Sequence, residues 1–333
     1  MVNKWTAEEI AIRLALTGEE SVSMRKEAEK ICESVYSKDV FIRGIIEFSN
    51  ICRKDCMYCG IRKSNKNTGR YRIEKEQIKK LLDDAYLEGY KTVVLQSGED
   101  TAVDRDITKI IEYTKSKNDM SVTLSLGERS FEVYEEWRKA GADRYLLRIE
   151  TTNKNIFTEI HPDDDFENRL RCLNDLKRLG YEAGTGIMIG LPGQTEMDLA
   201  KDIIFFKEND FDMLGFGPFI PHRDTPLKDV KAVSMEKVLN FLALCRIVTV
   251  DTNIPATTAM GTLDPKGRQM ALMSGANVIM PNFTPRALRK NYLLYDNKIG
   301  VDDDAEESLE TVRKIVEESG KRVSDVRGDR IKI

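Results

Sequence analysis

Short apolar runs alternate with amphipathic segments from residue 43 onward. Apolar runs of this length are typical of buried strands, and apolar residues spaced three or four apart are typical of helices. The predicted strands are Gly44–Asn50, Thr92–Ser97, Ser121–Leu126, Tyr145–Glu150, Gly184–Ile189, Met213–Pro218, Ile254–Ala259 and Asn277–Met280. The clearest predicted helices between them are Lys75–Leu87, Asp106–Ser116, Phe131–Ala140, Phe166–Leu179, Met197–Asn209, Met235–Val248 and Pro265–Met273.

This alternation predicts an α/β fold, because strand–helix–strand units form parallel sheets. Eight strands without an intervening linker favour a (β/α)8 TIM-type barrel over the alternative, an open flavodoxin-like sheet. We assign the barrel to residues 41–300. An N-terminal helical extension is expected over residues 1–40, and a C-terminal helix and tail packed on the barrel over residues 301–333.

Both end segments carry helix signals. Thr6–Glu9 has the pattern of a capped helix start, and a second helix is predicted from Ser21. The acidic run Asp302–Glu307 suits the N-terminus of a helix, where the helix dipole favours negative charge.

Composition narrows the class of protein. The chain has 333 residues and a net charge of −4, with no block of consecutive basic residues, so nucleic acid is not expected as a partner. Apolar runs such as Gly186–Leu191 are too short to span a bilayer. The first 17 residues carry four charges and no hydrophobic core of a signal peptide, which predicts a cytoplasmic protein without membrane contact.

Three cysteines, Cys52, Cys56 and Cys59, directly follow the first predicted strand. Thiolates bind iron–sulfur clusters, and three of them leave one iron of a four-iron cluster open. That iron can chelate S-adenosylmethionine (SAM), a carrier of radical chemistry. The spacing, with Tyr58 just before the last cysteine, is the hallmark of radical SAM enzymes, which this chain resembles. We therefore predict one [4Fe-4S] cluster and SAM as cofactors.

Other uses of the three thiols fit less well. A structural zinc site needs four ligands, but there is one Cys-x2-Cys pair, and His161 and His222 lie far away in sequence. A disulfide would leave one thiol over. Cys32, Cys172 and Cys245 lie in helix-like surroundings and are expected to be buried apolar residues. His222 is interpreted as a hydrogen-bonding loop residue.

In a barrel, the residues that end the strands meet at the active site. In Ser97-Gly98-Glu99, the glycine would allow a close approach of the backbone, and the glutamate offers a carboxylate for the ammonium group of SAM. An ordinary turn explains the motif equally well. Alternation places Thr123 and Ser125 on one face. It also places Arg148 and Glu150 together, opposite Ile149, either to bind a ligand or as a salt bridge at an exposed strand end. Arg169 could reach the SAM carboxylate, and the Gly/Pro-rich segment 186–195 could stack an adenine.

These segments together resemble the HydE family of [FeFe]-hydrogenase maturases over about residues 40–298. The similarity lies in residues 46–59, 94–100, 141–148, 217–222 and 253–262. It implies that Cys52, Cys56 and Cys59 hold the cluster. The cofactor-binding residues predicted with it are Tyr58, Ser97, Gly98, Glu99, Ser125, Glu150, Arg169 and Met188. The implied substrate residues are Arg43, Gln96, Thr123, Arg148, Thr257, Thr258 and Tyr292.

The resemblance also implies a reaction. SAM would be cleaved reductively to methionine and a 5′-deoxyadenosyl radical, which attacks a small cysteine-bound iron carbonyl cyanide complex on the way to the diiron cofactor. The expected partners are this small molecule, companion hydrogenase maturases and a reducing electron donor. Ile149 stands where some relatives have His, with little expected consequence. Residues 260–333 contain no Cys, so only one cluster is predicted.

Two alternatives remain open. One is a HydE-like paralogue that acts on a small organic, amino-acid-like substrate, as methylornithine synthase or biotin synthase does. Arg148 and the pair Thr257 and Thr258 suit an anionic ligand in either case. The other is a non-catalytic iron–sulfur carrier, which would have no use for Glu99, Glu150 or Arg169.

Overall fold

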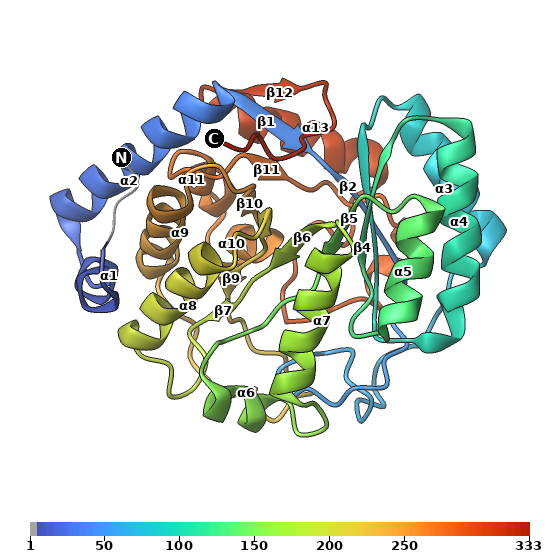
Figure 1. The fold of residues 1–333 in the computed structure, drawn as a ribbon, viewed down its shortest axis with the longest axis horizontal. Helices are drawn as coiled ribbons and strands as arrows, with labels where there is room; N and C mark the ends of the chain where they lie inside the picture. Colours follow the sequence, from blue (N-terminus) through green and yellow to red (C-terminus); the bar gives the residue numbers. More distant parts are fainter. Residues whose placement is uncertain (1–4) are drawn as a thin grey trace.

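A computed structural model describes residues 5–333, so the first four residues of the predicted extension lie outside it. Parallel strands form the centre of the molecule and helices surround them (Figure 1). The largest sheet pairs β2 (Gly44–Ser49), β3 (Thr92–Ser97), β4 (Ser121–Ser125), β5 (Arg144–Leu146), β6 (Glu182–Thr185) and β8 (Met213–Leu214) in that order, all parallel. The predicted α/β class with a parallel sheet is confirmed.

Two smaller sheets complete the strands. One has the order β10 (Pro255–Ala256), β11 (Val278–Ile279), β1 (Asp39–Ile42) and β12 (Arg322–Ser324), and the other pairs β7 (Met188–Ile189) with β9 (Gly217–Pro218). Isolated parallel bridges link β8 to Asn253, just before β10, and β2 to Asn282, just after β11. Sequence reasoning missed β1 and β12, because both are short and lie in segments with strong helix signals.

Helices separate most of the strands, as predicted. Their bounds are α1 (Ala7–Leu14), α2 (Gly18–Tyr36), α3 (Lys75–Leu87), α4 (Asp104–Lys117), α5 (Phe131–Ala140), α6 (Lys154–Ile160), α7 (Phe166–Arg178), α8 (Glu196–Glu208), α9 (Met235–Thr249), α10 (Thr258–Leu263), α11 (Gly267–Leu272), α12 (Arg286–Arg289) and α13 (Ala305–Glu318), with a 3₁₀ turn, η1 (Thr101–Val103). Among residues 5–333, no helix has the length and apolar character required to cross a bilayer.

The helix starts follow from local chemistry. Thr6 Oγ1 accepts from the Glu9 amide at 3.3 Å and Glu9 Oε2 accepts from the Thr6 amide at 2.8 Å, which confirms the predicted cap of α1. Helix α2 begins at Gly18 rather than at Ser21. Ser21 is buried instead and donates to Asn240 Oδ1 of α9 at 2.7 Å, so the N-terminal helices pack on the α8–α9 side of the molecule.

Four predicted strands are shorter or broken. The strand predicted over Tyr145–Glu150 ends at Leu146, and Glu150, which has a positive φ of 65°, pairs only as an isolated bridge with Ile187. The strands predicted over 184–189 and 213–218 are each interrupted. At that point a Cβ on Gly186 would lie 1.9 Å from Gly215 O, so the two backbones approach more closely than regular strands do. The strand predicted over 254–259 is reduced to β10.

The floor segment, residues 327–330, crosses beneath the N-terminal ends of the strands. Arg144, fully buried at the start of β5, forms ion pairs with Glu182 and Asp329, and its Nη1 donates to Ser121 Oγ at 2.7 Å. The Gly328 carbonyl accepts from Arg43 Nη2 at 3.0 Å. Further bonds to the floor segment come from Thr92 and Asn253, and Arg330 pairs with Asp251 at 2.6 Å.

Candidate cofactor and substrate site

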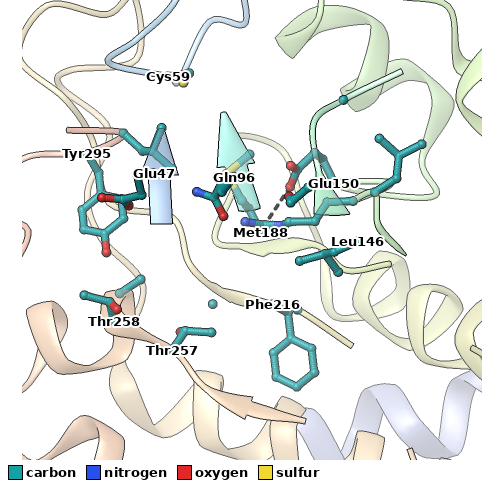
Figure 2. Close-up of a pocket in the computed structure, with 18 of the residues that line it drawn as sticks. Glu47, Cys59, Gln96, Leu146, Glu150, Met188, Phe216, Thr257, Thr258 and Tyr295 are labelled. Carbon is teal, nitrogen blue, oxygen red and sulfur yellow. Dashed lines mark ion pairs between the residues drawn. The ribbon is translucent and has the colours of Figure 1, made fainter. Parts of the chain in front are cut away.

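A cavity of about 380 Å³ opens at the C-terminal ends of the strands. All the site residues predicted from the sequence line it, although they come from segments as far apart as Arg43 and Tyr292. Figure 2 shows Cys59 at one end of the cavity and Thr257 and Thr258 at the other. A space of this size suits a small molecule.

The cysteine loop, residues 50–73, leaves β2 and folds over one end of the cavity. The Arg70 guanidinium holds the loop in shape by donating at 2.6–3.1 Å to four backbone carbonyls, those of Asn50, Ile61, Arg62 and Asn65. Asn65 Nδ2 also donates to the Gly60 carbonyl at 2.6 Å. The loop therefore has a defined conformation without regular secondary structure.

Cys52, Cys56 and Cys59 are free, half-buried thiols that line the same cavity. Burial, together with the neighbouring thiols, raises the pKa of Cys59 to about 12 and the pKa of Cys56 well above its usual value. Thiolates at these positions therefore require a bound cation, which fits iron ligation. Within residues 5–333, no three His, Cys, Asp or Glu side chains are arranged around a single metal ion. In a four-iron cluster, each thiolate binds its own iron.

The end of β3 packs directly against the cysteine loop. A Cβ on Gly98 would lie 2.4 Å from the Ile51 carbonyl and 2.8 Å from Cys52 Cβ, so the close backbone approach predicted here is real and requires glycine. The Glu99 amide donates to Cys52 Sγ at 3.3 Å. The buried Glu99 carboxylate pairs with Arg53 at 2.7 Å.

The segment after β5 carries the predicted charged pair. Arg148 and Glu150 form an ion pair at 2.9 Å on the cavity wall, marked in Figure 2, while Ile149 is fully buried on the other side. His161 Nδ1 donates to the Phe157 carbonyl at 3.1 Å, and burial lowers the pKa of His161 to about 3. The neutral ring therefore accepts at Nε2 from the Tyr58 hydroxyl, 3.1 Å away, and this bond directs Tyr58 to the cavity.

Arg169 is held by two acids that sequence reasoning did not assign to the site. Its Nε pairs with Glu128 at 2.6 Å, its Nη2 pairs with Asp164 at 2.8 Å, and its Nη1 donates to the Arg148 carbonyl at 2.6 Å. These partners raise its pKa, whereas burial lowers it. Glu128 was detectable as a carboxylate just after a strand, but Asp164 lies in a loop with no comparable signal.

A second ion pair on the cavity wall was also missed. Glu47 Oε1 and Lys298 Nζ lie 2.5 Å apart and both are buried. Asn282 Nδ2 donates to the other Glu47 oxygen at 3.0 Å, and Lys298 lies over the Tyr292 ring, 5.3 Å from its centroid. Figure 2 shows Glu47 and Tyr295 on the side of the cavity opposite Glu150. Lys298 gives no sequence signal, because it lies in an irregular segment.

Several polar atoms in the cavity have no hydrogen-bond partner among residues 5–333. Arg43 is 4% exposed and forms no ion pair with any described residue, and burial lowers its pKa to about 9, helped by the charge of Arg144. Within residues 5–333, no hydrogen bond is made by Arg43 Nε, Thr123 Oγ1, Arg148 Nε or Thr257 Oγ1. Buried polar atoms are normally satisfied, so these four mark a surface that a ligand completes.

Comparison with known proteins agrees with this geometry. Residues 46–206 match the profile of the Radical SAM superfamily. Over 297 residues the chain is 51% identical to the [FeFe] hydrogenase maturase subunit HydE of Thermotoga maritima, covering 89% of this chain and 85% of that protein. It is 26% identical to the 3-methylornithine synthase of Methanosarcina acetivorans, covering 76% of this chain and 72% of the relative.

Two solved structures share the fold. Methylornithine synthase (PylB) superposes with a TM-score of 0.84 at 22% identity, covering 97% of this chain and 95% of that one. The hydrogenase maturase HydG from Carboxydothermus hydrogenoformans gives a TM-score of 0.81 at 21% identity, covering 97% and 76%. The fold, the thiol-lined cavity and the family match together define a radical SAM enzyme, which uses a [4Fe-4S] cluster and SAM. Within that class, the chain belongs to the HydE family.

Proposed function

We propose that this enzyme acts in the assembly of the diiron cofactor of [FeFe]-hydrogenase by reductive cleavage of SAM. The observation that carries the proposal is the 51% identity to a HydE maturase over 89% of the chain. The partners proposed with it are a small-molecule substrate, companion hydrogenase maturases and a reducing electron donor. We also propose a cytoplasmic location, supported by six free thiols, which a reducing compartment preserves.

Cys52, Cys56 and Cys59 are proposed to hold the cluster. When bound, the cluster supplies the electron that cleaves SAM to methionine and a 5′-deoxyadenosyl radical. The residues proposed to bind SAM are Tyr58, Ser97, Gly98, Glu99, Ser125, Glu150, Arg169 and Met188. Arg169 is suited to this role because Glu128, Asp164 and the Arg148 carbonyl fix its guanidinium before any ligand enters.

The substrate is proposed to bind to Arg43, Gln96, Thr123, Arg148, Thr257, Thr258 and Tyr292. Support comes from the four unpartnered polar atoms, which all belong to this set. Two of the four are guanidinium nitrogens, so the group that completes them is an acceptor and carries negative charge. The deep end of the cavity, at Arg43, favours an anion most strongly because no protein carboxylate pairs with Arg43 among residues 5–333.

The architecture proposed for this function is a closed (β/α)8 barrel over residues 41–300. The bridges of β8 to Asn253 and of β2 to Asn282 support a continuous ring of strands. Residues 1–40 are proposed as the helical extension and residues 301–333 as a C-terminal helix and tail on the barrel. The strand pairs β1–β11 and β1–β12 run through both proposed boundaries, so the three parts are expected to fold as one unit.

Two measurements test the function. The reconstituted protein, reduced under anaerobic conditions and given SAM, is expected to release 5′-deoxyadenosine; without this product, the chain is a non-catalytic iron–sulfur carrier. The second measurement is activation of an apo-hydrogenase in the presence of the companion maturases, with and without this protein. Cleavage of SAM without hydrogenase activation would contradict the maturase role and favour an organic substrate of the methylornithine-synthase or biotin-synthase type.

A further inference from the structure

The ion pair between Glu47 and Lys298 has no role in the function proposed above. Both residues are buried and both line the cavity. Taking two charges out of water is costly, and apolar side chains of similar volume often stabilise a fold equally well. The pair is not needed to attach the segment after β11 to β2, because the Phe283 amide already donates to the Ile45 carbonyl at 2.7 Å.

Tyr292 is the cavity residue that Lys298 contacts. Lys298 Nζ donates to the Tyr292 carbonyl at 3.2 Å and lies 5.3 Å from the centroid of the Tyr292 ring. A cation over an aromatic face attracts the ring electrostatically. Lys298 therefore holds both the main chain and the ring of Tyr292, which lies in an irregular segment and belongs to no helix or strand.

The other end of the Tyr292 side chain meets Gln96 of β3. Gln96 Nε2 donates to the Tyr292 hydroxyl at 3.3 Å, and Gln96 is the register partner of Glu47 on β2. Two neighbouring strands thus hold opposite ends of one side chain, Gln96 directly and Glu47 through Lys298. Figure 2 shows Glu47 and Gln96 next to each other at the cavity.

This arrangement leaves the hydroxyl proton of Tyr292 for a ligand. The hydroxyl oxygen accepts from Gln96, and within residues 5–333 the hydroxyl donates to no acceptor. Burial and the nearby Glu47 carboxylate raise the pKa of Tyr292 well above its usual value, so the phenol keeps its proton. A neutral phenol can donate that proton in a hydrogen bond.

We propose that Glu47 and Lys298 are positioning residues, which hold the Tyr292 ring so that its hydroxyl donates to an acceptor atom of the substrate. This inference rests on the proposed function, which places Tyr292 and Gln96 among the substrate residues. The pair acts through Tyr292 rather than by its own contact with substrate, because both Glu47 carboxylate oxygens already accept, one from Lys298 and the other from Asn282.

The test removes both charges together, with Glu47→Gln and Lys298→Met in one protein, called the pair variant. A single substitution would leave a buried charge without its partner and could unfold the protein. The matched control is Glu135→Gln with Lys139→Met, which makes the same chemical changes at an exposed ion pair of α5, away from the cavity. Tyr292→Phe is made alone and in the pair variant.

The position of the ring is measured by fluorine NMR on the full-length reconstituted protein labelled with 3-fluorotyrosine. The chain contains 11 tyrosines, and the resonance that disappears in Tyr292→Phe belongs to Tyr292. This resonance is expected to shift in the pair variant and to stay in place in the control. An unchanged Tyr292 resonance in the pair variant would overturn the positioning role.

Hydrogenase activation with the companion maturases is measured for the same variants, per folded molecule. The pair variant and Tyr292→Phe are each expected to lose about tenfold, because each loses the same positioned hydrogen bond. Adding Tyr292→Phe to the pair variant should cost less than about twofold more, because both changes act on one contact. Losses that multiply would contradict action through Tyr292. If the wild type activated no hydrogenase, the proposed function would be overturned instead, and the fluorine resonance would still decide whether the pair positions the ring.

Discussion

The two ends of the parallel strands treat their polar groups in opposite ways. At the floor, the buried Arg144 has carboxylate and hydroxyl partners on every side, supplied by Glu182, Asp329 and Ser121. At the cavity, Arg148 and Thr257 are partly buried, and their atoms Nε and Oγ1 are shielded from solvent without a hydrogen-bond partner among residues 5–333. The contacts at the floor therefore stabilise the fold. The unpartnered atoms of the cavity can bind a ligand, and they lower the stability of the free protein.

This division follows from the parallel direction of the strands, which brings all their C-terminal ends to one side. Residues that end the strands face the site, whereas residues that begin them face the floor. An unpartnered buried polar atom lowers the free energy of unfolding by about 1–3 kcal/mol, so it persists where a ligand compensates it. Substitutions at the two ends should consequently separate activity from stability.

The largest effect is expected for Cys56→Ala. Loss of one of three thiolates should remove the cluster absorbance and all SAM cleavage, while the apoprotein unfolds at nearly the same denaturant concentration as the wild-type apoprotein. Absorbance, 5′-deoxyadenosine release and urea unfolding check this. Cys172→Ala, at a buried cysteine outside the cavity, should keep the cluster. Retained SAM cleavage in the Cys56 variant would show that the ligand assignment is wrong.

A large effect on stability alone is expected for Arg144→Ala. Removing this guanidinium leaves Glu182, Thr92 and Ser121 without their shared partner at the floor, which should lower the free energy of unfolding by about 3 kcal/mol. SAM cleavage per folded molecule should stay within about twofold of wild type, as Arg144 does not line the cavity.

Urea unfolding measures the effect of Arg144→Ala against a control, Arg322→Ala. Arg322 pairs with Asp39 at the surface with its side chain 68% exposed, so its loss should change the free energy of unfolding by less than about 1 kcal/mol. If Arg144→Ala abolished SAM cleavage without loss of stability, the separation of floor from cavity would not hold.

The smallest effect on stability is expected for Thr257→Val. Because Thr257 Oγ1 has no hydrogen bond, its replacement by a methyl group should leave the free energy of unfolding unchanged or raise it by about 1 kcal/mol. Hydrogenase activation should fall while SAM cleavage remains. Thr252→Val is the contrast: its hydroxyl donates to the Phe211 carbonyl at 3.1 Å, so that variant should lose about 1 kcal/mol and keep its activity. If Thr257→Val lost as much stability as Thr252→Val, the Thr257 hydroxyl would be stabilising, and the contrast between unpartnered cavity atoms and satisfied atoms elsewhere would be refuted.

Much of this organisation was predictable from local patterns. The bounds of β3, α3 and α5 agree with the predictions, because each has clear periodicity between turn residues. The cysteine spacing located one end of the cavity, and strand alternation placed Ile149 away from it. Strand-end reasoning also pointed to Ser97, Gly98, Glu99, Thr123, Ser125, Arg148, Glu150 and Arg169, whereas Arg43 came only from the family resemblance. All of these residues line the cavity.

Contacts between distant segments could not be predicted. Lys298 belongs to the site only through its ion pair with Glu47, 251 residues earlier in the chain. Asp164 belongs to it only through its ion pair with the Arg169 guanidinium. The breaks between β6 and β7 and between β8 and β9 depend on the approach of Gly186 to Gly215. Each feature depends on which strands lie side by side, information that no single window of sequence contains.

The Arg43–Gly328 hydrogen bond joins residues separated by 285 positions. During synthesis, Arg43 leaves the ribosome long before its carbonyl acceptor exists. The nascent chain therefore carries the three thiols and most of the strands while the N-terminal ends of the strands are still uncovered. Contacts so distant in sequence form late, so the strands are most exposed to aggregation in the interval before residue 328 emerges.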